Sequence, residues 1–199
     1  KAESRNKCGL PENYFLASAR FVEKKNLPAL LKAYAAYRRK AETLKREDKP
    51  PASSPWHLVL LGDGPLRAEL CRLISDLGLQ DFVLLPGFKQ YPDLPAYYGL
   101  ANAFVHASTT EQWGLVVNEA MASGLPVLVS NRCGCAPDLV QEGVNGWTFD
   151  PCNTDQLADL MLRLSQAPKQ RLEEMGAASR RIIQDWGVER FASGLKAAV

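Results

Sequence analysis

Residues 102–130 read NAFVHASTTEQWGLVVNEAMASGLPVLVS and contain two apolar runs on either side of a helical segment. The runs at 102–108 and 126–130 are short and continuous, as in strands that are buried on both faces of a parallel sheet. Residues 114–123 between them form a compact apolar helix. A strand, a helix and a second strand in this order make a βαβ unit, so this stretch predicts an α/β fold.

The same alternation of short apolar runs and longer amphipathic segments extends along the chain in both directions. Four further strands are expected, at 14–19, 57–62, 82–87 and 146–149. Helices are expected at 26–46, 65–77, 92–100, 136–142 and 168–184, with another from about residue 188. The chain is also expected to be helical after Asp150, where one apolar stripe includes Leu157 and Leu164. The pattern predicts one Rossmann-like, doubly wound parallel sheet of about six strands.

This pattern divides the chain into three parts. Residues 1–13 are a polar lead-in, 14–185 form the Rossmann-like domain, and 186–199 form a C-terminal helical extension. A polar segment that leads directly into a strand is typical of a domain that belongs to a longer protein. Residues 45–56, rich in Pro and Ser, are expected to be a surface loop and not a domain boundary.

Charge and hydropathy exclude several classes of partner. The formal net charge is +2, so nothing in the charge balance indicates binding to nucleic acid. No apolar run approaches the roughly 20 residues that cross a bilayer, and no signal-like start is present.

Five cysteines without a repeating pattern indicate reduced thiols and a cytoplasmic location. Cys133 and Cys135 lack a second Cys or His cluster that would complete a tetrahedral site, so no metal is expected. The two histidines, His57 and His106, are interpreted as packing residues and not as catalytic bases.

The loops that follow the strands are where ligands bind in doubly wound sheets. Arg20 and Lys25 follow the first strand, and Gly62 and Gly64 follow the second. Glycine permits close approach of the backbone, and the helix N-termini at this edge favour anions. The turn lacks the third glycine of a dinucleotide fingerprint, and the chain has no Walker motif. The loops therefore predict an anion site without identifying its ligand.

Two glutamates, Glu111 and Glu119, flank the start of the helix at 114–123. Glu111 lies in the loop at the mouth of the preceding strand, whereas Glu119 lies more than one turn inside an apolar helix. A buried carboxylate needs hydrogen-bond donors, and two vicinal ribose hydroxyls match its two oxygens. Alternatively, Asn118 and Glu119 form the one solvated strip of the helix, and the spacing does not decide between these interpretations.

At this point the chain resembles a known family over about residues 14–165. The matching segments are ARFVEKKN, LVLLGDGPLRAEL, VLLPGF, HASTTEQWGLVVNEAMASGLPVLVSN and GVNGWTFDP. They are similar to the carboxyl-terminal, donor-binding half of a retaining GT-B glycosyltransferase of the group 1, or family 4, type. That group includes bacterial mannosyl- and glucosyltransferases and sucrose synthase-like enzymes.

The resemblance implies a role for each matching residue. Glu119 would hold the ribose hydroxyls of the nucleotide, and Glu111 would face the donor sugar. The backbone amides of Gly114 and Leu115 would contact the diphosphate or the sugar. Arg20 and Lys25 would contact the diphosphate, and Phe88 and Lys89 would lie where the base docks. Gly62 and Gly64 would correspond to the family's glycine turn after the second strand.

The implied reaction transfers a sugar from a UDP-, GDP- or ADP-sugar, with retention at the anomeric carbon and without a cofactor. No Asp-x-Asp occurs, so a metal clamp has no obvious ligands, and two cations with a helix N-terminus would take its place. An N-terminal acceptor domain of the same protein would complete the enzyme and could bring it to the cytosolic face of a membrane. This domain alone would bind the donor without transferring it.

One loop departs from the family pattern. Gly134-Cys135-Ala136-Pro137-Asp138 stands where the family usually has Gly-Gly-x-Pro-Glu, so Cys135 replaces a glycine. This change leaves open the alternative of a non-catalytic module that binds nucleotide sugars. Another GT-B enzyme, such as an epimerase, is a separate alternative.

Overall fold

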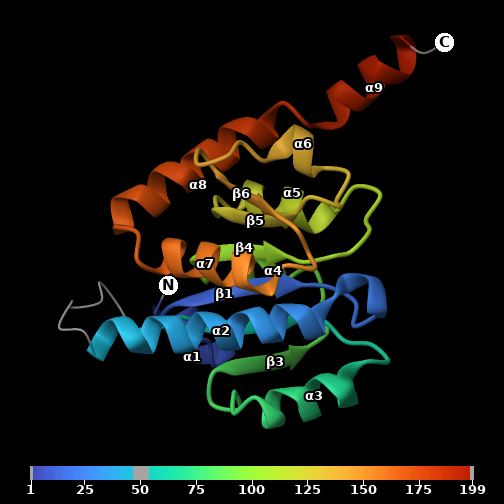
Figure 1. Ribbon diagram of the computed structural model, residues 1–199. Coiled ribbons are helices and arrows are strands. Elements are labelled where there is room, and N and C mark those ends of the chain that lie inside the picture. The colour runs from blue at the N-terminus through green and yellow to red at the C-terminus, as the bar shows by residue number, and fades with distance from the viewer. Residues whose placement is uncertain (1, 47–53, 198–199) are drawn as a thin grey trace.

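The computed structural model describes residues 2–46 and 54–197, and their strands form one parallel sheet (Figure 1). The strands are β1 (Tyr14–Ser18), β2 (His57–Leu61), β3 (Val83–Gly87), β4 (Ala103–His106), β5 (Val127–Ser130) and β6 (Gly146–Phe149). Their order is β3-β2-β1-β4-β5-β6, so the sheet is doubly wound and the direction of winding reverses between β1 and β4. The expected fold class is confirmed, and the switch point between β1 and β4 is where such sheets bind ligands.

The helices agree with the expected ranges to within a few residues. They are α2 (Leu27–Arg46), α3 (Arg67–Asp76), α4 (Leu94–Leu100), α5 (Leu115–Ala122), α6 (Ala136–Leu139), α7 (Thr154–Ser165), α8 (Lys169–Gln184) and α9 (Val188–Ala197). Two elements were not expected, the helix α1 (Ala2–Cys8) and the 3₁₀ helix η1 (Glu23–Lys25). Most of the loop predicted at 45–56 lies outside the described residues.

The polar lead-in predicted at 1–13 therefore contains a helix. It packs near α4, where the Arg5 guanidinium donates a hydrogen bond to the carbonyl oxygen of Leu100 at 3.3 Å. The sequence of α1 has no apolar stripe, because polar and charged residues make up most of it. Among residues 9–13, which follow the helix, only Leu10 is buried.

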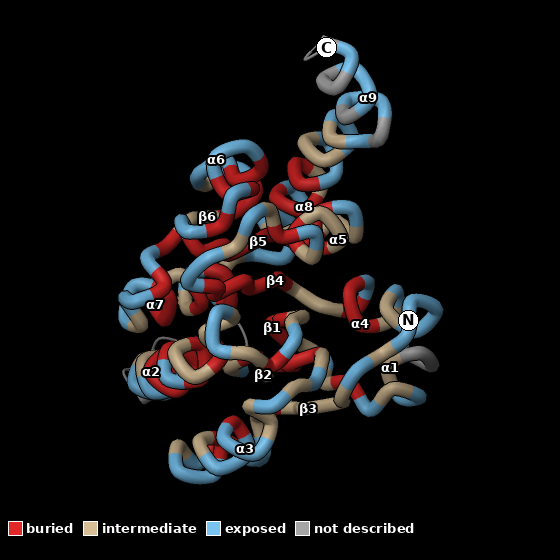
Figure 2. The backbone as a smooth tube through the Cα atoms, turned by 90° about the vertical axis from the view of Figure 1, so that its right-hand side faces the viewer, coloured by how far each residue is buried: buried red, intermediate tan, exposed pale blue. Residues whose placement is uncertain are grey.

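Helices cover both faces of the sheet, because successive residues of each buried strand point to opposite sides. Phe15 and its neighbours on one face pack with α2, α3 and α7. Leu16 and its neighbours on the other face pack with α4, α5 and α6. Buried residues follow the strands and the inward sides of the helices (Figure 2). The result is a three-layer sandwich that leaves the carboxyl edge of the sheet to its loops.

The C-terminal segment packs on the domain through α8 and then leaves it. Ser179 donates a hydrogen bond to the carbonyl oxygen of Leu125 at 2.7 Å, and the Trp186 ring lies 5.1 Å from that of Trp113. Beyond Trp186, α9 projects away from the sheet (Figure 1). None of the helices among residues 2–46 and 54–197 combines the length and apolarity that crossing a bilayer requires.

Candidate functional site

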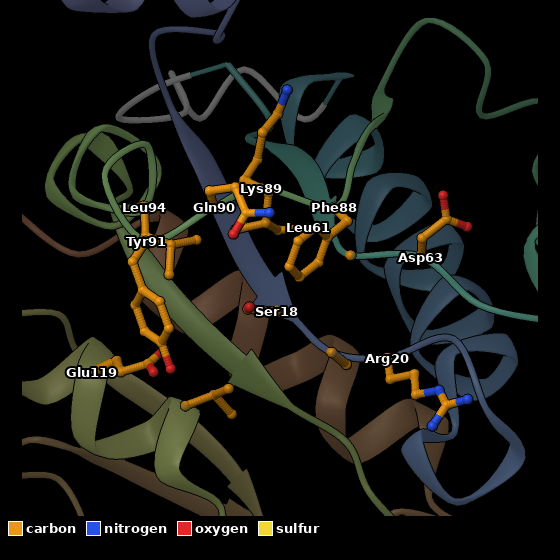
Figure 3. Close-up of a pocket in the computed structure, with 13 residues that line it drawn as sticks. Ser18, Arg20, Leu61, Asp63, Phe88, Lys89, Gln90, Tyr91, Leu94 and Glu119 are labelled. Carbon is orange, nitrogen blue, oxygen red and sulfur yellow. The ribbon is translucent and has the colours of Figure 1, made fainter.

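A cavity of about 530 Å³ lies at the carboxyl edge of the sheet, beside the switch point (Figure 3). We call it the switch-point cavity. It is lined by Ser18, Ala19, Arg20, Leu61, Gly62, Asp63, Phe88, Lys89, Gln90, Tyr91, Leu94, Val116 and Glu119. These residues come from the ends of β1 and β2 and the loops after them, from the segment between β3 and α4, and from α4 and α5. Segments that are far apart in the sequence therefore form one recess.

The wall of the cavity depends on a glycine after β2. Gly62 has φ +132°, and a Cβ there would lie 1.9 Å from the carbonyl oxygen of Ala19. Ala19 in turn donates its backbone N–H to Leu61 at 3.0 Å. A side chain at position 62 would push apart the loops after β1 and β2 and would require a strained backbone. The expected glycine turn thus lets two loops of the site approach each other.

Arg20 and Glu119 lie on opposite sides of this cavity (Figure 3). Arg20 follows β1 and is exposed, and no ion pair joins it to another residue of the described chain. Glu119, on α5, is half-buried and accepts a hydrogen bond at 2.8 Å from the hydroxyl of Tyr98. Asn118 is also half-buried and accepts a hydrogen bond at 3.0 Å from the Trp113 ring. Hydrogen bonds from Tyr98 and Trp113 thus engage both side chains, which the alternative of a solvated strip at Asn118 and Glu119 did not foresee.

Two large aromatic side chains stand exposed in the segment after β3. Phe88 is 68% exposed and Tyr91 is 81% exposed, although both line the cavity. Figure 3 shows the Phe88 ring directed into the recess and the Tyr91 side chain extending toward Glu119, whereas the ammonium of Lys89 points away from the recess. That ammonium lies 5.9 Å from the centre of the Tyr97 ring. Phe88 thus lines the cavity with its ring, whereas Lys89 lines it without its ammonium group. Tyr91 is an additional aromatic residue that the sequence analysis did not select.

A second group of charges, the Glu111 cluster, consists of Lys24, Lys25, His106 and Glu111. Lys25 donates a hydrogen bond to Glu111 in an ion pair, and each of the two side chains is only 14% exposed. The Lys24 ammonium lies 3.9 Å from Glu111 Oε1, and His106 Nε2 lies 3.8 Å from Glu111 Oε2. The backbone N–H of Thr109 donates to Lys24 O at 2.9 Å, which holds the loops after β1 and β4 together.

Glu111 is ionised within this cluster. Partial burial would raise its pKa, but the hydrogen bond and the charge of Lys25, with help from Lys24, lower it below the usual value. Lys25 is therefore placed at the expected edge of the sheet but is not a free cation, since Glu111 already balances its charge. The ammonium still carries two further N–H donors that can bind an anion.

The start of α5 lies against the Glu111 cluster. Gly114, the residue before the helix, has φ +106°, and a Cβ there would lie 3.6 Å from Glu111 Cγ and 3.7 Å from His106 Nε2. The space would tolerate a methyl group, so it is the left-handed backbone that requires glycine. Leu115, the first residue of α5, is 69% exposed. No described side chain caps this helix, so its first N–H groups are available to an anion.

His106 is buried at the end of β4 and stays neutral. Its ring stacks on Phe104 at 6.4 Å, and its Nε2 lies 3.2 Å from the Ser108 hydroxyl. Burial and the charge of Lys25 lower its pKa to about 4, against a smaller opposing effect of Glu111. The prediction that His106 is a satisfied packing residue agrees with this environment. The contact between His106 and Glu111 was not foreseen.

The pKa of His106 predicts that stability falls as the pH is lowered. Between about pH 6.5 and pH 4 the unfolded chain binds a proton at this residue and the folded chain does not. This difference should cost about 3 kcal/mol of unfolding free energy by pH 4. Urea titrations at pH 7.5, 6 and 5 measure the slope, which His106→Gln should reduce the most. His57, whose pKa burial and Arg38 also lower, is the matched control, and an unchanged slope in His106→Gln would contradict the assignment.

The two cysteines of the divergent loop lie beneath the Glu111 cluster. Cys133 and Cys135 are buried, and Cys135 donates its backbone N–H to the carbonyl oxygen of Trp113 at 3.2 Å. Burial raises the pKa of Cys133 to about 12 and that of Cys135 to about 11, so both thiols stay neutral. All five cysteines fall within the described residues and are free. Cys135 therefore acts as a small packing residue in place of the expected glycine.

The expected site residues thus gather in two neighbouring groups at one edge of the sheet. The first group lines the switch-point cavity and consists of Arg20, Gly62, Phe88, Lys89 and Glu119. The second group lies at the start of α5, where Lys25 and Glu111 of the Glu111 cluster adjoin Gly114 and Leu115. Gly64, also expected, lies in the turn between β2 and α3 and does not line the cavity. Tyr98 was missed because its spacing on α4 reads as a core position, and it is indeed buried.

The family described as "Glycosyl transferases group 1" matches residues 1–182 of this chain. A GDP-mannose-dependent alpha-(1-6)-phosphatidylinositol monomannoside mannosyltransferase of Mycobacterium tuberculosis is 30% identical over 204 residues. That alignment covers 98% of this chain and 49% of the mannosyltransferase. The amylovoran biosynthesis glycosyltransferase AmsK of Erwinia amylovora is 33% identical, over 76% of this chain and 35% of AmsK. The chain thus spans about half or less of the length of these relatives.

Solved structures show the same architecture. Anabaena Alr3699/HepE in complex with UDP superposes with a TM-score of 0.79 at 25% identity, over 98% of this chain and 52% of HepE. Sucrose-phosphate synthase of Thermosynechococcus elongatus gives a TM-score of 0.75 at 27% identity, over 100% of this chain and 50% of the synthase. The six-stranded sheet is therefore the Rossmann-like domain of the GT-B architecture.

Proposed function

The chain belongs to the glycosyl transferases group 1 family, and from this premise we propose that it is the donor-binding half of a retaining glycosyltransferase. Such an enzyme moves a sugar from a nucleoside-diphosphate sugar to an acceptor with retention at the anomeric carbon. An N-terminal domain of the same protein would hold the acceptor and could associate with the cytosolic face of a membrane. This half then binds the donor and transfers nothing by itself.

One observation carries the proposal. The switch-point cavity has a guanidinium on one side and a carboxylate on the other, and the start of α5 lies next to it. A nucleoside diphosphate presents the complementary groups, two phosphates and two vicinal hydroxyls. HepE, which shares this fold, has been solved with UDP and with UDP-glucose, which supports a nucleotide sugar as the ligand.

The departing diphosphate gains negative charge as the glycosidic bond breaks. We assign its stabilisation to Arg20, to the free N–H donors of Lys25, and to the backbone amides of Gly114 and Leu115. Fixed donors of this kind stabilise a developing charge most where they need no rearrangement. These groups can act without a metal ion, and we propose that the enzyme uses none.

The two ends of the donor are assigned from the geometry of the walls. Phe88 and Tyr91 would stack on the nucleobase, because both rings are exposed and both residues line the cavity. Glu119 would accept hydrogen bonds from the ribose hydroxyls. Glu111, at the mouth of β4, would face the donor sugar while it holds Lys25 in place. The base and the sugar are the subject of the following test.

Thermal unfolding with UDP, GDP and ADP, and with their glucose and mannose derivatives, tests the donor assignment. One base should raise the unfolding temperature, because a ligand that binds only the folded chain stabilises it. Turnover with the same donor is then measured on the full-length enzyme. A chain that binds none of these compounds would contradict the proposal, and binding without turnover would identify a non-catalytic module.

Replacing Glu119 by alanine should weaken binding of the selected nucleoside diphosphate by about 1–3 kcal/mol, the usual scale for hydrogen bonds to a charged group. Isothermal titration calorimetry measures the loss. Glu173→Ala is the control, since Glu173 is an exposed glutamate on α8 that does not line the cavity and pairs with Lys169. Equal affinities for wild type and Glu119→Ala would remove the ribose assignment.

A further inference from the structure

Tyr98 is the one partner that the structure gives to the carboxylate of Glu119 among the described residues. Its side chain is buried in α4, and its ring stacks on Phe104 with centroids 5.8 Å apart and an interplanar angle of 23°. Phe104 stacks in turn on His106. Three ring layers thus fix the direction of the phenol, and its hydroxyl lies 2.8 Å from Glu119 Oε2.

The direction of this hydrogen bond is settled by chemistry. Burial raises the pKa of the Tyr98 phenol, and Glu119 raises it further, so the phenol remains protonated and donates. A carboxylate that accepts from a hydroxyl forms a charge-assisted bond, which is roughly twice as strong as one between neutral groups.

The bond leaves most of the carboxylate free for a ligand. An ionised glutamate has about four acceptor positions on its two oxygens, and Tyr98 uses one of them. Glu119 lines the switch-point cavity, so the remaining positions can accept from groups within it. Without Tyr98, this side chain would sample several rotamers, and a ligand would have to order it on binding.

We propose that Tyr98 is a positioning residue that holds the Glu119 carboxylate ready for the vicinal hydroxyls of a ribose. The inference rests on the proposed function, because it takes the cavity to bind a nucleoside diphosphate. Tyr98 does not touch the ligand; it acts through Glu119 alone. Its effect therefore depends on hydroxyls of the ligand that Glu119 contacts.

The test compares Tyr98→Phe with wild type in calorimetric titrations of UDP, GDP and ADP. For the diphosphate that binds most tightly, Tyr98→Phe should raise Kd about five- to tenfold. The 2′,3′-dideoxy form of that diphosphate should bind wild type and variant equally, because it offers no hydroxyl to Glu119. Tyr97→Phe is the matched control, since Tyr97 is the adjacent buried tyrosine and does not line the cavity.

A double variant separates positioning from a structural effect. In the Glu119→Ala background, adding Tyr98→Phe should leave Kd unchanged within about twofold, because no side-chain acceptor remains for Tyr98 to position. An equal loss for the ribose and dideoxy ligands, or wild-type affinity in Tyr98→Phe, would overturn the role of Tyr98. If Glu119→Ala weakens binding while Tyr98→Phe does not, the donor site stands and only this inference fails. If wild type binds none of the three diphosphates, the proposed function fails as well.

Discussion

Arginine 20 replaced by alanine should lower the turnover number of the full-length enzyme by a factor of about 10² to 10³. Donor affinity should fall much less, by no more than about tenfold. The reason is that the diphosphate gains charge only as the glycosidic bond breaks, so a hydrogen-bond donor directed at the diphosphate contributes most in the transition state. The effect should therefore appear in kcat and in kcat/KM to a similar extent.

The position of Arg20 supports this expectation. It directly follows β1 at the switch point, it lines the cavity, and its guanidinium is exposed and free of ion pairs with the described residues. Lys25, the other cation of the same loop, is already neutralised by Glu111. Arg20 therefore adds an unpaired positive charge where the diphosphate would lie. Its planar fork can also bind two phosphate oxygens at once.

Steady-state kinetics and calorimetry on the same preparations check the prediction. Arg20→Lys should recover part of the turnover, because it keeps the charge and loses the fork. Arg72→Ala is the control, since Arg72 is an exposed arginine of α3 that does not line the cavity. A loss of donor affinity as large as the loss of turnover would contradict a role specific to the transition state.

The fold was largely predictable because its signals are local. Each buried strand is a continuous apolar run, and each helix after it has its own amphipathic spacing, as in the stretch from β4 to β5. The α1 helix escaped prediction for the same reason, since it has no apolar stripe to detect. The placement of Arg20, Gly62 and Phe88 was also predictable, because residues after parallel strands must meet at one edge.

The pairings between side chains could not be predicted, because they depend on which loops become neighbours. Lys25 meets Glu111 only because β1 lies beside β4, although the two residues are far apart in the sequence. Tyr98 reaches Glu119 because α4 and α5 cover the same face of the sheet. A tyrosine at a core spacing gives no sign of such a partner. The sequence pattern therefore locates the site but not its internal hydrogen bonds.

Lysine 25 replaced by alanine should lower the free energy of unfolding by about 2–4 kcal/mol. Lys25 and Glu111 are largely removed from solvent, and breaking such a pair leaves one charge without a close partner. Lys24 can compensate only in part, because it is half exposed and its ammonium lies 3.9 Å from Glu111. Turnover should fall as well, since the N–H groups with which Lys25 would bind the diphosphate are lost.

The double variant Lys25→Ala/Glu111→Gln distinguishes an unpaired charge from lost packing. It should recover most of the lost stability, because no unpaired charge remains, while turnover stays low. Urea unfolding measures the first quantity, and kinetics on the full-length enzyme measure the second. Lys40→Ala breaks the more exposed pair with Asp159 and should change stability by less than about 1 kcal/mol. Additive losses in the double variant would show that the two residues stabilise the fold independently, and the Glu111 cluster would then not be a coupled unit.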